Sequence, residues 1–158
     1  YGYAVQFLQD TSRVDVRRLG VIGSSFGGMV AVAAQDKRIK AMVTLSTPYK
    51  MPPFEKPRIL KEVGECYELL SGTRIRKRFY EEVRKYDLLE TIRSAPPILI
   101  IHGSLDTVVP VMHAQILYEA APEPKRMEIV EGADHVFSQS EHLNKVIDLS
   151  LEWFKKYL

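Results

Sequence analysis

The most constraining feature of this chain is the stretch LGVIGSSFGGMVAV at residues 19–32, in which a Gly-x-Ser-x-Gly pattern separates two apolar runs. The first run is short and aliphatic, as in a buried strand, and the second has the composition of a packed helix. A sharp turn between a strand and a helix crowds the positions two before and two after its central residue. The pattern therefore predicts that Gly23 and Gly27 must be small and that Ser25 projects from the end of the strand. Gly28 would let the helix approach the strand closely.

Strand-like and helix-like segments alternate along the rest of the chain. Short apolar runs bounded by Gly, Pro, Ser or charged residues predict strands at residues 19–22, 41–45, 98–101 and 127–130. Helical spacing predicts helices at residues 3–8, 29–35, 114–121 and 142–158. This alternation predicts a single α/β domain over residues 1–158, with a mostly parallel sheet in a three-layer α/β/α arrangement.

The last helix has the clearest apolar repeat. One face carries Leu143, Ile147, Leu151, Phe154 and Leu158. The preceding Ser138-x-x-Glu141 predicts a capping box at the start of this helix.

The segment between Pro48 and Pro96 is longer than an ordinary crossover between neighbouring strands requires. It opens with TPYKMPPFEKP and continues with helical patterns around residues 59–70 and 74–92. We therefore predict a helical cap insertion over residues 48–96, resting on the carboxyl end of the sheet. Its basic run RIRKR, at residues 74–78, could hold an acidic partner but is more typical of a solvated helix face.

Composition bounds the function. With 158 residues, 46 % hydrophobic and 27 % charged, the chain has the size and balance of one ordinary globular domain. A net charge of +2, evenly spread, does not indicate nucleic acid as the main partner. No apolar run is long enough to span a bilayer, so no membrane partner is expected. The single cysteine, Cys66, excludes an internal disulfide and a thiolate metal cluster, and fits a cytoplasmic location.

Two further loops carry side chains that could act with Ser25. A serine hydroxyl needs a neighbouring base to become a nucleophile, and the base needs an acid to orient it. The stretch HGSLDTVVP places Asp106 after the third predicted strand, and EGADHVFS places His135 after the fourth. Because the carboxyl ends of parallel strands meet at one edge of a sheet, we predict a Ser25–His135–Asp106 triad there. The Phe26 N–H, at the start of a helix, would donate to a developing oxyanion.

Other candidates have weaker support from the sequence. His102 is expected to be packed or hydrogen-bonded, and His113 and His142 to be solvated. Asp134 adjoins His135, but side chains of neighbours in an extended loop diverge. We expect Asp36 to lie at a polar helix end and Cys66 to be a buried or idle thiol.

Three sequence blocks together resemble a known superfamily. VIGSSFGGMVA, ILIIHGSLDTVVP and IVEGADHVF are similar to blocks of the α/β-hydrolase serine hydrolases, including microbial carboxylesterases, feruloyl-esterase-like members and prolyl-oligopeptidase catalytic domains. The resemblance covers nearly the whole chain except the insertion. It implies two-step hydrolysis of a small-molecule ester by the triad, with no metal or organic cofactor. Dienelactone hydrolases share the layout with a cysteine nucleophile, and Ser25 argues against their chemistry.

The resemblance also implies strands that precede this sequence, with a loop that supplies a second oxyanion donor. We therefore expect these residues to be the carboxyl-terminal part of a larger hydrolase. The strand at 19–22 would otherwise be an open apolar edge. We expect that edge to pair with the missing segment, with a second chain or, if the piece exists alone, with another copy in a homodimer.

The substrate pocket and the exact activity are less constrained. Tyr49, Met51, Phe54 and also Tyr67 are expected to line the pocket, although core packing is the commoner role of aromatic side chains. A serine peptidase of the prolyl-oligopeptidase type would use the same triad. A non-catalytic binding module would keep the fold without the chemistry. The sequence leaves these alternatives open.

Overall fold

The computed structural model describes residues 2–11, 14–50, 59–69, 72–83 and 85–158. The chain divides into two compact units, one formed by Tyr1–Tyr49 with Leu88–Leu158 and the other by Lys50–Asp87. All three residues of the predicted triad belong to the first unit.

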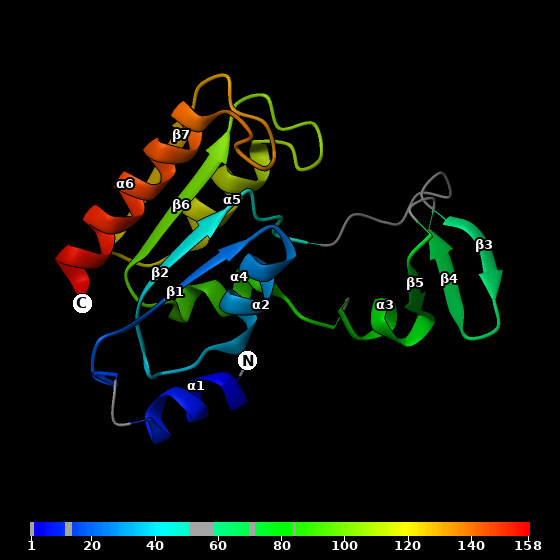
Figure 1. Cartoon of the computed structure of the whole chain (residues 1–158), viewed down its shortest axis with the longest axis horizontal. Helices are drawn as coiled ribbons and strands as arrows, with labels where there is room; N and C mark the ends of the chain where they lie inside the picture. Colours follow the sequence, from blue (N-terminus) through cyan, green and yellow to red (C-terminus); the bar gives the residue numbers. More distant parts are fainter. Residues whose placement is uncertain (1, 12–13, 51–58, 70–71, 84) are drawn as a thin grey trace. The chain divides into compact units, whose positions relative to one another are not determined.

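The first unit is built on a four-stranded sheet with the order β1-β2-β6-β7 (Figure 1). The strands are β1 (Leu19–Ser24), β2 (Ile39–Leu45), β6 (Ile98–Gly103) and β7 (Lys125–Val130). Every neighbouring pair is parallel. The four strands predicted from the sequence are therefore confirmed, and their carboxyl ends share one edge of the sheet.

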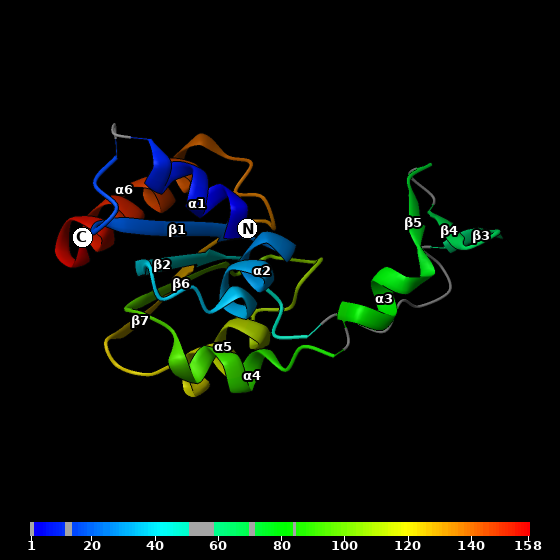
Figure 2. The ribbon, with the colours of Figure 1, turned by 90° about the horizontal axis from the view of Figure 1, so that it is seen from below.

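Helices cover both faces of this sheet, as Figure 2 shows. One face carries α1 (Gly2–Asp10) and α6 (Ser140–Tyr157). The other carries α2 (Phe26–Ala34), α5 (Met112–Ala120) and the short α4 (Leu88–Thr91), which continues into a 3₁₀ turn at Ile92–Ser94. The predicted three-layer α/β/α architecture is confirmed.

One part of the core lies between the central strands and α6. All six residues of β6 are buried, as expected for a central strand with helices on both faces. Alternate residues of β2 and β6 pack with α6 in one cluster, whose buried members include Ala41, Val43, Leu99, Ile101, Val146 and Trp153. The Trp153 indole N–H donates to the Pro97 carbonyl at 3.2 Å, so the ring is both packed and hydrogen-bonded.

The buried face of α6 differs from the prediction. Leu143, Ile147 and Leu151 are 45–49 % exposed, whereas Val146, Ser150 and Trp153 are buried. Burial of Ser150 costs little, because its hydroxyl donates to the Val146 carbonyl at 2.7 Å.

The predicted capping box at the start of α6 is also wrong. The residue that precedes the helix is Gln139, and it makes no side-chain cap. The Ser138 hydroxyl instead donates to Asp134, four residues before it.

The second unit is not the predicted pair of helices. It is a three-stranded antiparallel sheet of β3 (Ile59–Val63), β4 (Cys66–Leu69) and β5 (Arg74–Arg76), followed by α3 (Lys77–Val83). The helical residues near 88–94 belong to the first unit instead. How the second unit lies against the large sheet stays a prediction.

A tight turn and paired charges explain why this segment forms strands. Gly64 adopts a φ of 57° between β3 and β4, a conformation that glycine supplies without strain. Across the sheet, Glu68 pairs with Lys61 on one side and Arg74 on the other. The basic run 74–78 is thus split between β5 and α3, and its Arg74, Lys77 and Arg78 make ion pairs within the unit.

Candidate active site

Ser25 occupies a one-residue turn between β1, which ends at Ser24, and α2, which begins at Phe26. Its backbone has a φ of 51° and a ψ of −119°, outside the regions that residues with a Cβ normally adopt. The Ser25 N–H donates to the Leu45 carbonyl at 2.7 Å, and the Ser25 carbonyl accepts the first hydrogen bonds of α2. The surrounding backbone therefore holds a strained residue, an arrangement that is typical of functional sites.

The glycines around this turn do not all have the predicted role. A Cβ on Gly23 would lie 2.6 Å from the Gly27 carbonyl oxygen, so position 23 must be glycine, as predicted. Gly28 lies against Thr47, just beyond β2, and a side chain there would overlap it. A Cβ on Gly27 would have no atom within 4 Å among the described residues. The predicted crowding at Gly27 is therefore wrong within this part of the protein.

Asp106 lies in the loop after β6, and its side chain is fully buried. Its Oδ1 accepts the backbone N–H groups of Val108 and Val109, both at 2.8 Å. Burial opposes ionisation of this carboxyl group. The Val109 N–H, the His135 ring and the Val108 N–H outweigh it, and the pKa of Asp106 lies below its ordinary value. Asp106 is thus an anion at neutral pH.

His135 lies in the loop after β7 and joins the other two residues. Its Nδ1 is 2.7 Å from Asp106 Oδ2, and its Nε2 is 3.1 Å from Ser25 Oγ. Because a carboxylate only accepts hydrogen bonds, Nδ1 carries the proton and Nε2 accepts from the Ser25 hydroxyl. The His135 side chain remains 16 % exposed, so the ring can be reached from outside. The structure brings together the three residues that the sequence singled out.

The acidic residues among the weaker candidates pair with other side chains. The Asp134 carboxylate accepts both the N–H and the hydroxyl of Ser138, which hold the pKa of Asp134 below its ordinary value. Asp36 pairs with Arg38. Cys66 lies in the second unit as a free cysteine.

Two further histidines make hydrogen bonds in the first unit. His113 was predicted to be solvated, but its Nδ1 accepts the Tyr49 N–H at 3.2 Å and the two rings are 4.8 Å apart. His102 is fully buried, as predicted, and its Nε2 lies 3.2 Å from Asp106 Oδ2. The signal that could have indicated His102 is its place at the end of a buried strand, four residues before the predicted acid.

The structure describes only some of the predicted substrate-binding residues. Tyr49 is half-buried beside His113, beyond the carboxyl end of β2. Met51 and Phe54 lie outside the described residues. Tyr67 belongs to the small sheet of the second unit, where Lys77 Nζ lies 5.5 Å from the centre of its ring.

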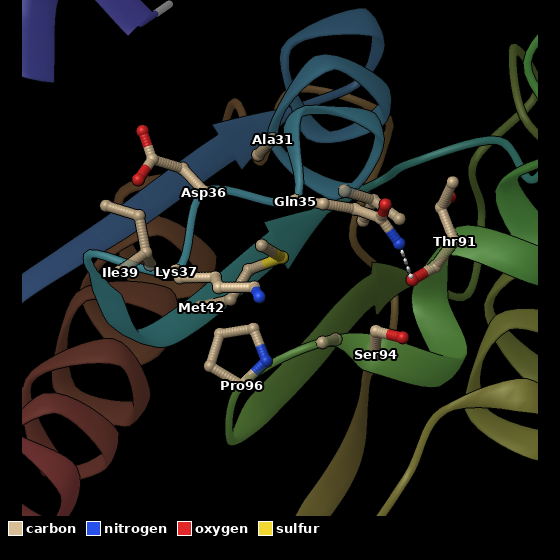
Figure 3. Close-up of a pocket in the computed structure, with 11 residues that line it drawn as sticks. Ala31, Gln35, Asp36, Lys37, Ile39, Met42, Thr91, Ser94 and Pro96 are labelled. Atoms are coloured by element: carbon tan, nitrogen blue, oxygen red, sulfur yellow. Dashed lines mark hydrogen bonds between the residues drawn. The ribbon is translucent and has the colours of Figure 1, made fainter.

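A pocket of about 230 Å³ lies elsewhere in the first unit, between the end of α2, the start of β2 and the turn after α4 (Figure 3). Gln35 closes one side by donating to the Thr91 carbonyl at 3.1 Å. None of Ser25, Asp106 and His135 lines this pocket. The carboxyl edge of the sheet therefore remains the candidate site.

The described residues offer neither a metal site nor a helix that could span a membrane. No group of three or more His, Cys, Asp and Glu side chains there is placed to hold a metal ion. None of the described helices combines the length and the apolar character needed to cross a bilayer.

The sequence matches a known family over nearly its full length. The model of the prolyl oligopeptidase family, Peptidase_S9, covers residues 3–158. An uncharacterized protein of Mycobacterium tuberculosis is 31 % identical over 133 residues, which are 84 % of this chain and 43 % of that protein. The chain therefore spans less than half the length of this curated relative.

Solved structures of hydrolases share the fold. The esterase domain of a Rhodothermus marinus protein superposes with a TM-score of 0.75 at 26 % identity, covering 98 % of this chain and 66 % of that one. A puromycin-hydrolyzing peptidase of Mycobacterium tuberculosis superposes with a TM-score of 0.74 at 21 % identity, covering 98 % of this chain and 24 % of that one. Both esterases and peptidases are thus among the structures that this fold resembles.

Proposed function

The chain belongs to the prolyl oligopeptidase family of α/β hydrolases, and from that premise we propose that the full-length protein is a serine hydrolase that cleaves carboxylic esters through an acyl-enzyme. One observation carries the proposal. Ser25 Oγ, the His135 ring and the Asp106 carboxylate form a continuous chain of hydrogen bonds of 3.1 and 2.7 Å at the carboxyl edge of the sheet.

The reaction follows from this geometry. Ser25 Oγ attacks the ester carbonyl carbon while His135 Nε2 takes the hydroxyl proton, and Asp106 stabilises the imidazolium that forms. His135 then gives the proton to the leaving alcohol oxygen as the ester C–O bond breaks. Water attacks the acyl-enzyme by the same route, which releases the acid and restores the Ser25 hydroxyl. Every proton in this cycle has a donor and an acceptor, and no metal or organic cofactor is required.

Oxyanion stabilisation involves Phe26 and a second donor. The Phe26 N–H follows Ser25 directly and lies at the N-terminus of α2, where the helix dipole favours negative charge. In α/β hydrolases a second N–H comes from a loop that precedes the nucleophile in the sequence. Removing one such donor costs on the order of a hundred- to a thousandfold in rate. The proposal therefore concerns the full-length protein.

Ester hydrolysis is the first choice of reaction because the similarity to the Rhodothermus marinus esterase domain, at 26 % identity, extends over 98 % of this chain. Peptide hydrolysis is the second candidate, since the family to which the chain belongs is the prolyl oligopeptidase family. Tyr49, Met51 and Phe54 are the residues that we propose as part of the substrate pocket.

The exposed edge of β1 is also part of this proposal. β1 is an end strand of the sheet, and Ile22 on it is 52 % exposed. We propose that polypeptide of the full-length protein beyond these residues covers the edge, because the chain spans 43 % of one relative and 66 % of the esterase domain. Pairing of this edge with a second copy is the alternative, and the oligomeric state of the full-length protein in light scattering distinguishes the two.

A fluorophosphonate probe tests the nucleophile. Full-length wild type should be labelled, Ser25→Ala should not, and Ser24→Ala should be labelled like wild type. Ser24 is the matched control because it is the neighbouring serine, at the end of β1. Absence of labelling in the wild type would end the enzyme proposal and leave a non-catalytic binding module.

A substrate panel then separates the two reactions. Nitrophenyl esters of graded acyl length should be hydrolysed with a higher kcat/KM than prolyl and aminoacyl nitroanilides. The reverse order would replace the esterase by a serine peptidase. Loss of both activities in Ser25→Ala would tie either outcome to the proposed site.

A further inference from the structure

A second histidine, which has no role in the mechanism, lies next to Asp106 in the proposed site. His102, in β6, has no exposed surface. Its Nε2 is hydrogen-bonded to the Val109 carbonyl at 2.8 Å and lies 3.2 Å from Asp106 Oδ2. The same Asp106 oxygen is 2.7 Å from His135 Nδ1. Asp106 is therefore flanked by two histidines, one facing the nucleophile and one inside the core.

The neighbours of His102 fix which ring nitrogen carries the proton. The Val109 carbonyl and the Asp106 carboxylate are both acceptors, so Nε2 must be the donor. Nδ1 is buried and has no hydrogen-bond partner among the described residues. The ring thus acts through Nε2 alone.

Val109 connects His102 to the other side of the carboxylate. The Val109 N–H donates to Asp106 Oδ1 at 2.8 Å, and the Val109 carbonyl accepts from His102. His102 therefore fixes Val109, which lies at one end of the turn, while Asp106 lies at the other end. With Val109 fixed, Asp106 Oδ1 stays hydrogen-bonded to the backbone N–H groups, and Asp106 Oδ2 stays directed at His135.

We propose that His102 is a positioning residue for Asp106: its Nε2–H anchors the Val109 carbonyl and borders Oδ2, so that the carboxylate stays aimed at His135. This inference rests on the proposed function, since Asp106 orients a catalytic base only if Ser25 is a nucleophile. His102 itself touches no substrate.

Two substitutions of matched polarity test the proposal in the full-length protein. Glutamine can place its side-chain N–H₂ where imidazole Nε2 lies, whereas the shorter asparagine places its N–H₂ near the position of Nδ1. His102→Asn should lower kcat for the best ester substrate by about 10- to 100-fold with KM little changed, the loss expected for one hydrogen bond in a charged network. His102→Gln should restore kcat to within about threefold of wild type, because the donor returns to its place.

The outcomes separate this proposal from the proposed function. If wild type is not labelled by the fluorophosphonate, the proposed function fails before His102 is tested. If wild type is labelled and both variants keep wild-type kcat, the positioning role is wrong. Equal loss in the two variants would show that His102 only fills space, and a change in KM alone would place it in substrate binding.

One measurement needs no variant and is unaffected by a failure to fold. Long-range ¹H–¹⁵N correlation spectra of the wild-type protein distinguish the two imidazole tautomers. We expect the proton of His102 on Nε2. A proton on Nδ1 would leave the Val109 carbonyl without its donor and would overturn the proposal.

Discussion

Gly103 lies so close to Ala133 that a side chain on Gly103 would overlap the Ala133 carbonyl. Gly103 ends β6 and Ala133 follows β7, so this contact joins the loop that carries Asp106 to the loop that carries His135. Around it, Ser104 N–H donates to Val130 and Leu105 N–H donates to Ala133, each at 3.0 Å. The 2.7 Å distance between Asp106 and His135 thus depends on two backbones packed directly against each other.

Replacing Gly103 should therefore damage both stability and activity. In Gly103→Ala the added methyl meets a backbone carbonyl, which cannot rotate away as a side chain could. We expect a loss of about 1–3 kcal/mol in the free energy of unfolding. Separation of the two loops should lower kcat by about 10- to 100-fold. Urea unfolding and ester kinetics measure the two effects, and a fully active, equally stable variant would contradict the contact.

The two glycines of the serine turn should respond differently to alanine. Gly23→Ala places a methyl 2.6 Å from the Gly27 carbonyl oxygen and should destabilise the protein by about 1–3 kcal/mol. Gly27→Ala adds a methyl that meets no described atom, in a helix that favours alanine over glycine by about 1 kcal/mol. In thermal unfolding, the Tm of Gly23→Ala should lie below that of wild type, and the Tm of Gly27→Ala should equal or exceed it. Equal losses would mean that residues beyond the described part crowd Gly27.

Sequence patterns predicted where the three side chains of the candidate site lie because their positions follow from the topology of the sheet. Once the strands are parallel, the residues after β1, β6 and β7 must lie at one edge, and Ser25, Asp106 and His135 do. The partners of His102 and His113 could not be predicted in this way. They depend on where the Val109 carbonyl and the Tyr49 N–H lie, and no pattern of residue types specifies that.

Errors in the remaining elements have identifiable physical causes. α6 carries apolar residues over more than half of its circumference, so the pattern alone does not specify which face is buried. The buried face is the one with the large Trp153 ring, which is hydrogen-bonded to Pro97. The chosen face includes Ser150, which a hydropathy pattern counts as exposed. In the second unit, the apolar spacing predicted helices around residues 59–70 and 74–92, but Lys61, Glu68 and Arg74 pair across three strands.

Asp106 and Asp134 provide a matched test of the orienting acid, because both lie near His135, but the Asp106 carboxylate is hydrogen-bonded to the His135 ring and the Asp134 carboxylate to Ser138. Asp106→Asn keeps the size of the side chain, but its amide can donate to His135 Nδ1 and favour the wrong tautomer. We expect kcat to fall by about 10⁴-fold. Asp134→Asn should lower kcat by less than about tenfold, because the Asp134 carboxylate is hydrogen-bonded to Ser138 within its own loop. Similar losses in the two variants would contradict the assignment of Asp106.

Stability should depend on pH through the same carboxylate. Burial opposes ionisation of Asp106, but the Val109 N–H, the His135 ring and the Val108 N–H lower its pKa below the ordinary 3.8. A group with a depressed native pKa adds stability above its unfolded pKa, and that contribution is lost as the pH falls through the native value. The free energy of unfolding of wild type relative to Asp106→Asn should thus be constant from about pH 7 to about pH 5 and decline below about pH 4. A difference that grows on acidification would contradict the sign.

The exposed apolar face of α6 predicts that further polypeptide covers this helix in the full-length protein. Leu143, Ile147 and Leu151 recur every four residues on the outer face of α6, each 45–49 % exposed in the part of the chain described. If further polypeptide covers this face, Leu151→Lys should lower the free energy of unfolding of a full-length monomer by about 1.5–3 kcal/mol, the value of a buried leucine. Asn144→Lys, at an exposed polar position of the same helix, should change it by less than about 0.5 kcal/mol. Light scattering distinguishes the alternative, since coverage by a second copy would give a dimer that Leu151→Lys dissociates. A monomer whose stability is unchanged by Leu151→Lys would show that this face of α6 stays open to solvent.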